Sequence, residues 1–370
     1  MARLSRGSFL PRREQPQFVH VAFVSMKTAH HRDRRGLERA RRTARLLAER
    51  GHDVTYLCAQ WWGGDAVPTF EHEGIEYRRV TREPAAGAFA AKLPAALWRA
   101  GADVIHAVES IPRHVAVAEK AGTLLRTPVL VDWFGDGASE PGSEARAASG
   151  ADLVTTPSEL VRTRVRERGG DDGSVRVVPE SIDVETIREA PADDRFDVVY
   201  ARRLDEHANV GTLLLALAER RQRDWSAAII GDGPEREAVE TAARDLRIDD
   251  RITFTGTLPE RERVSIYKGA HVFAQTATTE PFATELLRAL ACGCLGVVEY
   301  QANSSAHELV EGVDRGRRVT SPEEMADVIT GAGRVPHREY DDSFDAFDHG
   351  AVLETYLDCY EEIRTGGGLF

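Results

Sequence analysis

The sequence predicts an α/β protein of two doubly wound, Rossmann-like domains that face each other across a cleft. Its 370 residues suit two domains of ordinary size. In both halves, short apolar runs alternate with amphipathic stretches of about 10–15 residues, which is typical of a parallel sheet with helices on both faces. Acidic residues and prolines interrupt the alternation near Glu180–Asp194, where we expect the hinge. Open parallel sheets bind ligands at the carboxyl ends of their strands, so the cleft is the expected site.

The first half opens with a predicted buried strand over Phe18–Ser25, an apolar and β-branched run. A helix is predicted over Leu37–Arg50, because its apolar residues recur at helical spacing and Gly51 ends it. Further strands are predicted over Asp53–Cys58, Val104–Val108, Val129–Trp133, Leu153–Thr156 and Val175–Val178, with a helix over His114–Leu125.

The second half repeats this alternation. Strands are predicted over Phe196–Ala201, Ala227–Gly231, Arg251–Thr255, His271–Thr276 and Gly296–Glu299. Helices are predicted over Val210–Glu219, Pro234–Leu246, Thr284–Cys292 and, at the end of the chain, Ala351–Ile363. The pattern therefore predicts a second parallel sheet with its own helices.

The composition excludes several classes of protein. Sixty acidic and 48 basic residues give a net charge of −12, which disfavours nucleic-acid binding. No apolar run approaches the ~18–20 residues of a membrane-spanning helix, and the basic segment before residue 18 lacks the apolar core of a secretory signal. The four cysteines are too few and too scattered for a disulfide framework. We therefore expect a cytoplasmic protein.

Four segments between Tyr200 and Val310 carry a resemblance to a known family. They are, in order, ARRLDEHANVGTLLLAL, IIGDGPEREAVETAARDLRIDDRITFTGTLP, AHVFAQTATTEPFATELLRALACG and SSAHELVEG. Together they resemble the donor domain of glycosyltransferase family 4, which has the GT-B fold. The first half resembles the family more loosely, through DVIHAVES and VVPESID.

The resemblance implies a retaining hexosyltransferase that moves a sugar from a nucleotide-sugar donor to a glycan or lipid-linked acceptor, in cell-surface glycan or glycoprotein glycan assembly. It also implies the domain plan. We expect a basic tail over 1–17, an acceptor-binding domain over 18–185, a donor domain over 186–350, and a C-terminal helix over 351–370 that returns to the first domain.

Glu280 is the residue that we expect to orient the donor sugar. It lies between the predicted strand over His271–Thr276 and a helix that starts near Ala283. This places its carboxylate beside the free N–H groups of Phe282, Ala283 and Thr284. Such a helix end binds phosphate, and the carboxylate can accept hydrogen bonds from sugar hydroxyls. The alternative is an acid that merely caps an ordinary helix.

Arg203 follows the predicted strand over Phe196–Ala201 and matches the family arginine that contacts the donor diphosphate. Arginine suits this role because its planar guanidinium binds phosphate through two hydrogen bonds and stays charged. The alternative is a surface arginine next to Arg202. The glycines of Gly231-Asp-Gly233 are expected to permit a tight turn and not to bind ligand.

Several family positions are changed. The second family glutamate, eight residues after the first, is Arg288 here, and Glu285 lies one turn earlier on the same helix face. We expect both residues in the donor site. Ala208 replaces the family lysine that helps to neutralise the diphosphate. The family histidine after the fourth strand is absent, so Asp132 or Asp136 would have to take its place, and we name Asp132 as the catalytic candidate.

Two other functions remain open. An inactive homologue that acts as a scaffold or partner of another glycosyltransferase would explain the changed positions. A nucleotide-sugar epimerase or phosphorylase is the other, although none of the four lysines is placed for a pyridoxal phosphate Schiff base. Asp-x-Asp, by which transferases of the other main fold hold a nucleotide-bound cation, does not occur. We expect no metal and no cofactor.

A basic segment predicts peripheral contact with an anionic membrane, at the inner face of the cell membrane. Residues 27–45 hold eight basic and two acidic residues. Arg35, Arg39 and Arg42 recur at helical spacing and are expected to form one exposed row. The alternative is an ordinary solvated helix face.

Overall fold

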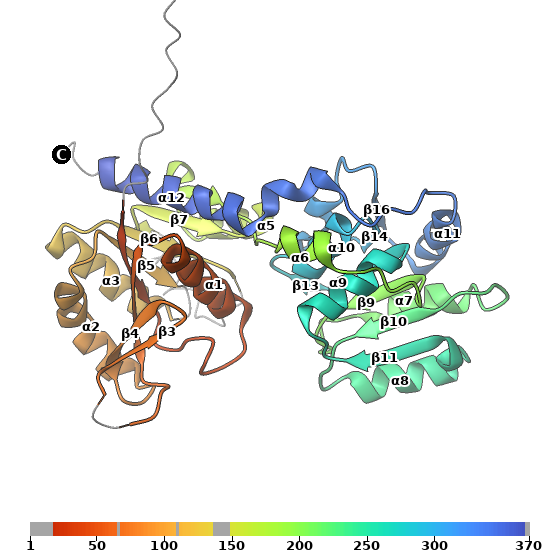
Figure 1. Cartoon of the computed structure of the whole chain (residues 1–370), viewed down its shortest axis with the longest axis horizontal. Coiled ribbons are helices and arrows are strands. Elements are labelled where there is room, and N and C mark those ends of the chain that lie inside the picture. The colour runs from red at the N-terminus through yellow and green to blue at the C-terminus, as the bar shows by residue number, and fades with distance from the viewer. Residues whose placement is uncertain (1–17, 65–66, 109–110, 136–148, 367–370) are drawn as a thin grey trace, which may run out of the picture.

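The structure is a computed structural model that describes residues 18–64, 67–108, 111–135 and 149–366. The predicted tail over 1–17 and Asp136 lie outside these residues. Figure 1 shows two α/β halves side by side, joined near α6 and by the long helix α12. No helix in the described ranges has the length and apolar character that crossing a membrane requires.

The first half contains an eight-stranded sheet in the order β3-β4-β2-β1-β5-β6-β7-β8. Only β3 is antiparallel to its neighbour among these described strands. The strands are β1 (His20–Val24), β2 (Asp53–Ala59), β3 (Thr69–His72), β4 (Ile75–Thr81), β5 (Val104–Val108), β6 (Val129–Asp132), β7 (Leu153–Thr156) and β8 (Val175–Val177). The helices are α1 (Arg35–Glu49), α2 (Ala86–Ala100), α3 (Pro112–Leu125) and α5 (Glu159–Glu167).

The second half contains a six-stranded parallel sheet in the order β11-β10-β9-β12-β14-β16. The strands are β9 (Val198–Ala201), β10 (Ala227–Ile230), β11 (Ile252–Gly256), β12 (Val272–Gln275), β14 (Leu295–Glu299) and β16 (Gly316–Val319). The helices are α6 (Val184–Glu189), α7 (Val210–Ala218), α8 (Arg236–Asp245), α9 (Glu260–Gly269), α10 (Thr284–Ala291) and α11 (Pro322–Ala332). A small parallel pair, β13 (Thr279–Glu280) and β15 (Asn303–Ser304), lies apart from this sheet.

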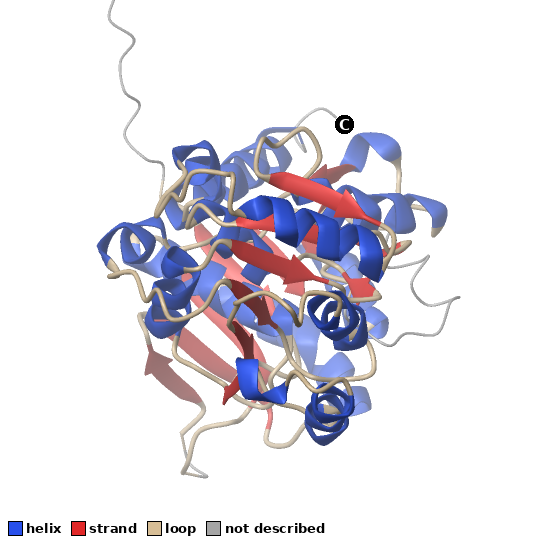
Figure 2. Ribbon diagram, turned by 90° about the vertical axis from the view of Figure 1, so that its right-hand side faces the viewer, coloured by secondary structure: helices blue, strands red, loops and turns tan. Residues whose placement is uncertain are grey.

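Helices cover both faces of each sheet, as Figure 2 shows. In the first half, α1 contributes Leu37 and Leu47 to the core on one face, and α2 contributes Phe89 and Leu93 to the core on the other. In the second half, α7 and α11 pack on one face, and α6, α9 and α10 pack on the other. This layered arrangement confirms the predicted α/β class, which follows from apolar strands that are buried on both faces.

The last helix, α12 (His349–Gly366), leaves the second half and packs on the first sheet beside α1. Its apolar face, which includes Val352, Tyr356, Tyr360 and Ile363, joins the core that α1 forms with the strands. The two halves are therefore tied together by buried contacts of this helix as well as by the chain at α6.

Several elements were not predicted. Helix α2 contains Pro94, and a proline inside a helix removes a backbone donor and usually ends it. Strand β3 is a short edge strand whose Thr-Phe-Glu-His sequence lacks an apolar run. The other missed elements are β4, α5, α6, α9, α11, β13, β15 and β16.

Candidate active site in the interdomain cleft

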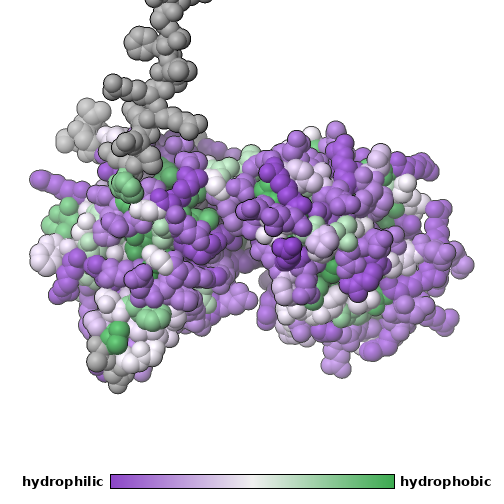
Figure 3. Space-filling view, viewed as in Figure 1, coloured by the Kyte–Doolittle hydropathy of each residue, from purple (hydrophilic) through white to green (hydrophobic). Residues whose placement is uncertain are grey.

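A pocket of about 960 Å³ lies between the two halves and is lined by residues of both. Figure 3 shows the surface hollowed between the halves, with hydrophilic residues along its rim. Charged side chains dominate the lining. The arginines are Arg34, Arg35, Arg42, Arg202, Arg203, Arg263 and Arg288, and the acids are Asp33, Glu38, Glu180, Asp205, Glu280 and Glu285.

Many of these residues lie in the segments that follow the carboxyl ends of β1, β9 and β12. The loop after β1 leads to α1, which begins at Arg35. Arg202 and Arg203 directly follow β9, and Glu280 lies on β13 in the connection from β12 to α10. Gly231, at the end of β10, has a φ of +134°, and a Cβ there would lie 2.0 Å from the Arg202 carbonyl oxygen. A glycine is required at this position because the two loops touch through their backbones.

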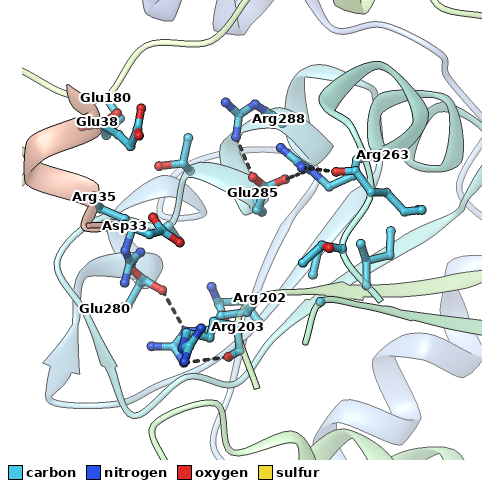
Figure 4. Close-up of a pocket in the computed structure, with 18 of the residues that line it drawn as sticks. Asp33, Arg35, Glu38, Glu180, Arg202, Arg203, Arg263, Glu280, Glu285 and Arg288 are labelled. Atoms are coloured by element: carbon cyan, nitrogen blue, oxygen red, sulfur yellow. Dashed lines mark hydrogen bonds and ion pairs between the residues drawn. The ribbon is translucent and has the colours of Figure 1, made fainter. Parts of the chain in front are cut away.

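Glu280 is almost completely buried and is held by two arginines from opposite halves. Its side chain is 2% exposed, and its two oxygens accept hydrogen bonds from Arg35 Nη1 and, at 3.2 Å, from Arg202 Nε. Arg202 also donates to Asp205 at 2.6 Å. Burial alone would lower the pKa of Arg202, but the Glu280 and Asp205 carboxylates outweigh it and raise the pKa. Arg202 therefore stays charged at neutral pH, and Figure 4 shows it beside Glu280 in the pocket.

Arg203 and the start of α10 face the same pocket. The Arg203 side chain is exposed, and no carboxylate of a described residue lies within ion-pair distance of it. Ala283 and Thr284 line the pocket, whereas Phe282 packs its ring into the core. The Thr284 N–H already bonds the Phe282 carbonyl at 3.1 Å. Arg203 and this helix start form a part of the pocket that suits an anion.

Glu285 and Arg288 are brought together with two further charged residues. Arg288 donates to Glu285 at 2.6 Å and to Glu260 at 2.9 Å. Glu285 also accepts from Arg263 at 3.2 Å and from the Tyr267 hydroxyl at 2.7 Å. Burial would raise the pKa of Glu285, but Arg288 and Arg263 overcome it and lower the pKa. Both residues line the pocket, already engaged with each other.

Ala208, at the position of the family lysine, faces away from the pocket. Ala208 is buried, and its carbonyl oxygen accepts hydrogen bonds from the hydroxyls of Tyr200 at 2.8 Å and Thr276 at 3.1 Å. A second positive charge for a diphosphate therefore has to come from another residue.

Asp132, the catalytic candidate from the sequence, does not line the pocket. It is fully buried at the end of β6, where it accepts hydrogen bonds from Arg39, Thr155 and Tyr356. Burial would raise its pKa, but the Arg39 charge holds the pKa well below its usual range. An acid locked between these partners is not positioned to exchange a proton with a substrate in the pocket, so we propose a structural role for Asp132 instead.

The expected exposed row of arginines on α1 is wrong. Arg39 is 2% exposed and points inward to Asp132 and Glu180. Arg42 pairs with Glu180, and Arg35 pairs with Glu280 across the cleft. These arginines pair with acids that are distant in the sequence. Their side chains therefore point to the protein interior and the cleft and do not form an exposed row.

Two residues of the site were missed in the sequence. Arg202 was given no role in the predicted site, although its side chain is only 10% exposed and contacts Glu280. Arg35 was placed in the exposed row. The signal for Arg202 is its position at the end of a predicted strand, one residue before Arg203. For Arg35, the signal is its position at the helix start that follows the first strand.

Two family models match most of the chain. Glycosyl transferases group 1 matches residues 183–331, and the glycosyl transferase 4-like domain matches residues 36–180. A GDP-mannose-dependent alpha-(1-6)-phosphatidylinositol monomannoside mannosyltransferase from Mycolicibacterium smegmatis is 28% identical over 199 residues, 50% of each chain. A 2-deoxystreptamine glucosyltransferase from Streptomyces kanamyceticus is 26% identical over 156 residues, 38% of this chain and 40% of that one. The chain thus spans about half the length of the first relative and less of the second.

Solved structures show the same fold over nearly the whole chain. Sucrose-phosphate synthase from Thermosynechococcus elongatus has a TM-score of 0.75 at 17% identity and covers 94% of this chain and 100% of its own. The Anabaena protein HepE in complex with UDP has a TM-score of 0.72 at 18% identity, with the same coverage. These likenesses show that the chain has the GT-B fold, and the two matching family models show that it belongs to glycosyltransferase family 4.

Proposed function

We propose that this protein transfers a hexose from a nucleotide sugar, bound in the cleft, to an acceptor bound by the first domain, with retention of configuration and without a metal. The observation that carries the proposal is the buried Glu280 carboxylate beside the free Arg203 and the start of α10. A sugar diphosphate needs these two kinds of group, an acceptor for hydroxyls and a cationic end for phosphate.

In this proposal the donor diphosphate binds Arg203 and the helix start at Ala283–Thr284. The hexose then lies towards Glu280, which orients it through its hydroxyls. The departing nucleoside diphosphate develops negative charge, and fixed arginines and backbone N–H groups stabilise that charge without reorganising at the moment of reaction. Closure of the two domains excludes water, which would otherwise hydrolyse the donor.

The proposed acceptor is a glycan or a lipid-linked molecule, which brings the protein to the surface of an anionic membrane. The mycobacterial relative supports a lipid acceptor, since its name describes transfer to phosphatidylinositol monomannoside. The α1 arginines no longer support membrane contact, because Arg39 is buried and Arg42 is paired. Co-sedimentation with vesicles of anionic phospholipid, at low and high salt, tests this part separately.

An inactive scaffold is the second candidate function. The Glu285–Arg288 pair favours it, because both side chains that would hold the donor ribose are already bound to each other and to their neighbours. A scaffold does not require nucleotide binding.

The test is incubation with a panel of UDP-, GDP- and ADP-hexoses, with nucleoside diphosphate release and donor-induced thermal stabilisation as readouts. We expect one base to stabilise the protein and its sugar nucleotide to release the diphosphate. Release without added acceptor reports hydrolysis, and its increase with a lipid-linked glycan identifies the acceptor class. Absence of both binding and release across the panel would support the scaffold.

A further inference from the structure

Arg35 reaches from the first domain to the sugar-binding carboxylate of the second. It is the first residue of α1, and its Nη1 donates to Glu280 Oε1 and, at 3.3 Å, to the Phe282 carbonyl oxygen. Arg202 occupies the other oxygen of Glu280. With both oxygens engaged and the side chain almost wholly buried, a sugar hydroxyl reaches Glu280 only if one of the two guanidinium groups moves away. Figure 4 shows Arg35 beside Glu280 in the pocket.

The two arginines are held with unequal strength. Arg202 is 10% exposed, and it also donates to Asp205 at 2.6 Å and to the Thr279 carbonyl oxygen at 3.1 Å. The Arg35 side chain is 43% exposed, and besides Glu280 it contacts the Phe282 carbonyl oxygen through a long bond of 3.3 Å. A half-exposed guanidinium keeps part of its hydration, so breaking its ion pair costs less free energy. Arg35 is therefore the partner that an incoming sugar displaces.

A displaced Arg35 lies where the donor needs a second cation. A nucleoside diphosphate sugar carries about two negative charges on its phosphates. Among the described residues, Arg203 is the one pocket arginine of the donor domain without a carboxylate within ion-pair distance, and Arg34, at the start of α1 in the first domain, is another such arginine. Ala208, at the place of the family lysine, is buried and faces away. Arg35, Arg203 and Thr284 all line the same pocket, so a guanidinium released from Glu280 remains beside the phosphate end.

We propose that Arg35 is a donor-binding residue that exchanges partners. In the empty cleft it neutralises Glu280, and when the sugar takes Glu280 it pairs with the donor diphosphate. The first domain thereby supplies the charge that the donor domain lacks at Ala208, and recognition of the sugar is coupled to the approach of the two domains. This inference rests on the proposed function.

Isothermal titration of wild type and Arg35→Gln with UDP, GDP and ADP, and with UDP-glucose, GDP-mannose and ADP-glucose, tests the exchange. We expect Arg35→Gln to weaken binding of the intact nucleotide sugar about 10-fold or more, the loss of one charge-assisted bond. The corresponding diphosphate, which has no sugar to displace Arg35 from Glu280, should bind within about 3-fold of wild type. Arg35→Lys should recover part of the loss, since it keeps the charge.

Arg45→Gln is the matched control, because it removes one positive charge from the same helix outside this pocket. It should bind every ligand as wild type does. If Arg35→Gln bound the nucleotide sugar as tightly as wild type does, the role of Arg35 would be overturned and the proposed function would stand. Tighter binding by Arg35→Gln, or equal weakening of sugar nucleotide and diphosphate, would overturn the exchange. A wild type that binds none of the six ligands would overturn the proposed function and this inference with it.

Discussion

Arg39 and Asp132 form an ion pair that is closed to solvent, although the two residues lie 93 positions apart. Arg39 Nε donates to both carboxylate oxygens at 3.2 and 3.0 Å, and its other nitrogens reach the carbonyl oxygens of Val178 and Pro179. The Tyr356 hydroxyl of α12 donates to the same carboxylate at 3.2 Å. The pair therefore joins α1, β6, the segment after β8, and α12, which fixes the C-terminal helix to the first sheet.

Asp132→Asn should destabilise the fold and not the chemistry. Removing one partner of a buried pair costs about 3–5 kcal/mol, and here it leaves Arg39 charged with Glu180, at 3.2 Å, as its carboxylate partner among the described residues. Urea unfolding measures this as a lower free energy of unfolding, with α12 less protected against amide hydrogen exchange. Asp327→Asn, on the exposed side of α11, is the control and should change little. An Asp132→Asn protein of wild-type stability that lost only its turnover would restore Asp132 as a catalytic residue.

Stability should fall as the pH is lowered from 7. Burial lowers the pKa of six histidines in the described ranges below the usual 6.5. They are His30, His31, His52, His106, His114 and His349. Below pH 6.5 the unfolded chain binds protons at these groups before the folded chain does, so the free energy of unfolding decreases.

The loss should steepen below about pH 4. The arginines beside Asp132 and Glu285 lower the pKa of both carboxyls, so their contribution is fully present above the usual values of 3.8 and 4.5. It is lost as the pH falls towards the lowered values. Urea unfolding at pH 7.5, 6.0, 5.0, 4.0 and 3.0 checks the direction and the steeper loss below pH 4. A free energy of unfolding that stayed constant or rose between pH 7 and 5 would contradict it.

The sequence predicts the layers better than the directions of charged side chains. β5 (Val104–Val108) and β7 (Leu153–Thr156) were predicted at the observed residues, because a strand buried on both faces is a continuous apolar run. Arg39 points into the protein because it pairs with Asp132, which lies far along the chain. The spacing of residues around Arg39 cannot reveal such a partner. Glu280 and Arg203 were predicted from motifs that lie within single loops. The contribution of Arg35 from the opposite domain depends on how the two sheets face each other.

Arg203→Ala should weaken binding of the preferred nucleoside diphosphate by about 1.5–3 kcal/mol, which is the range for a lost charge-assisted hydrogen bond. The reason is that this side chain lacks a carboxylate partner among the described residues, so its full charge is available to phosphate. Isothermal titration measures the change, and Arg244→Ala, on α8 outside the pocket, is the control. Unchanged affinity for UDP, GDP and ADP in Arg203→Ala, when wild type binds one of them, would contradict the assignment.

Glu280→Gln should reduce turnover by about 100-fold or more and leave the affinity for the nucleoside diphosphate within a few-fold. The substitution keeps the shape of the side chain but removes its charge. It thereby weakens the hydrogen bonds to sugar hydroxyls and the stabilisation of positive charge that develops on the sugar ring. Binding of the diphosphate is spared because the phosphates are assigned to Arg203 and the start of α10, which the substitution does not touch.

Two measurements separate this assignment of Glu280 from a structural role. Urea unfolding reports whether the loss of the Arg35 and Arg202 ion pairs destabilises the protein. Steady-state kinetics at saturating donor report the chemical step itself. Glu38→Gln, which removes a charge from the opposite wall of the same pocket, is the matched control and should keep most of the turnover. If Glu280→Gln instead lost affinity for the diphosphate and kept its turnover at saturation, Glu280 would belong to the phosphate site, and the sugar would have to lie elsewhere in the cleft.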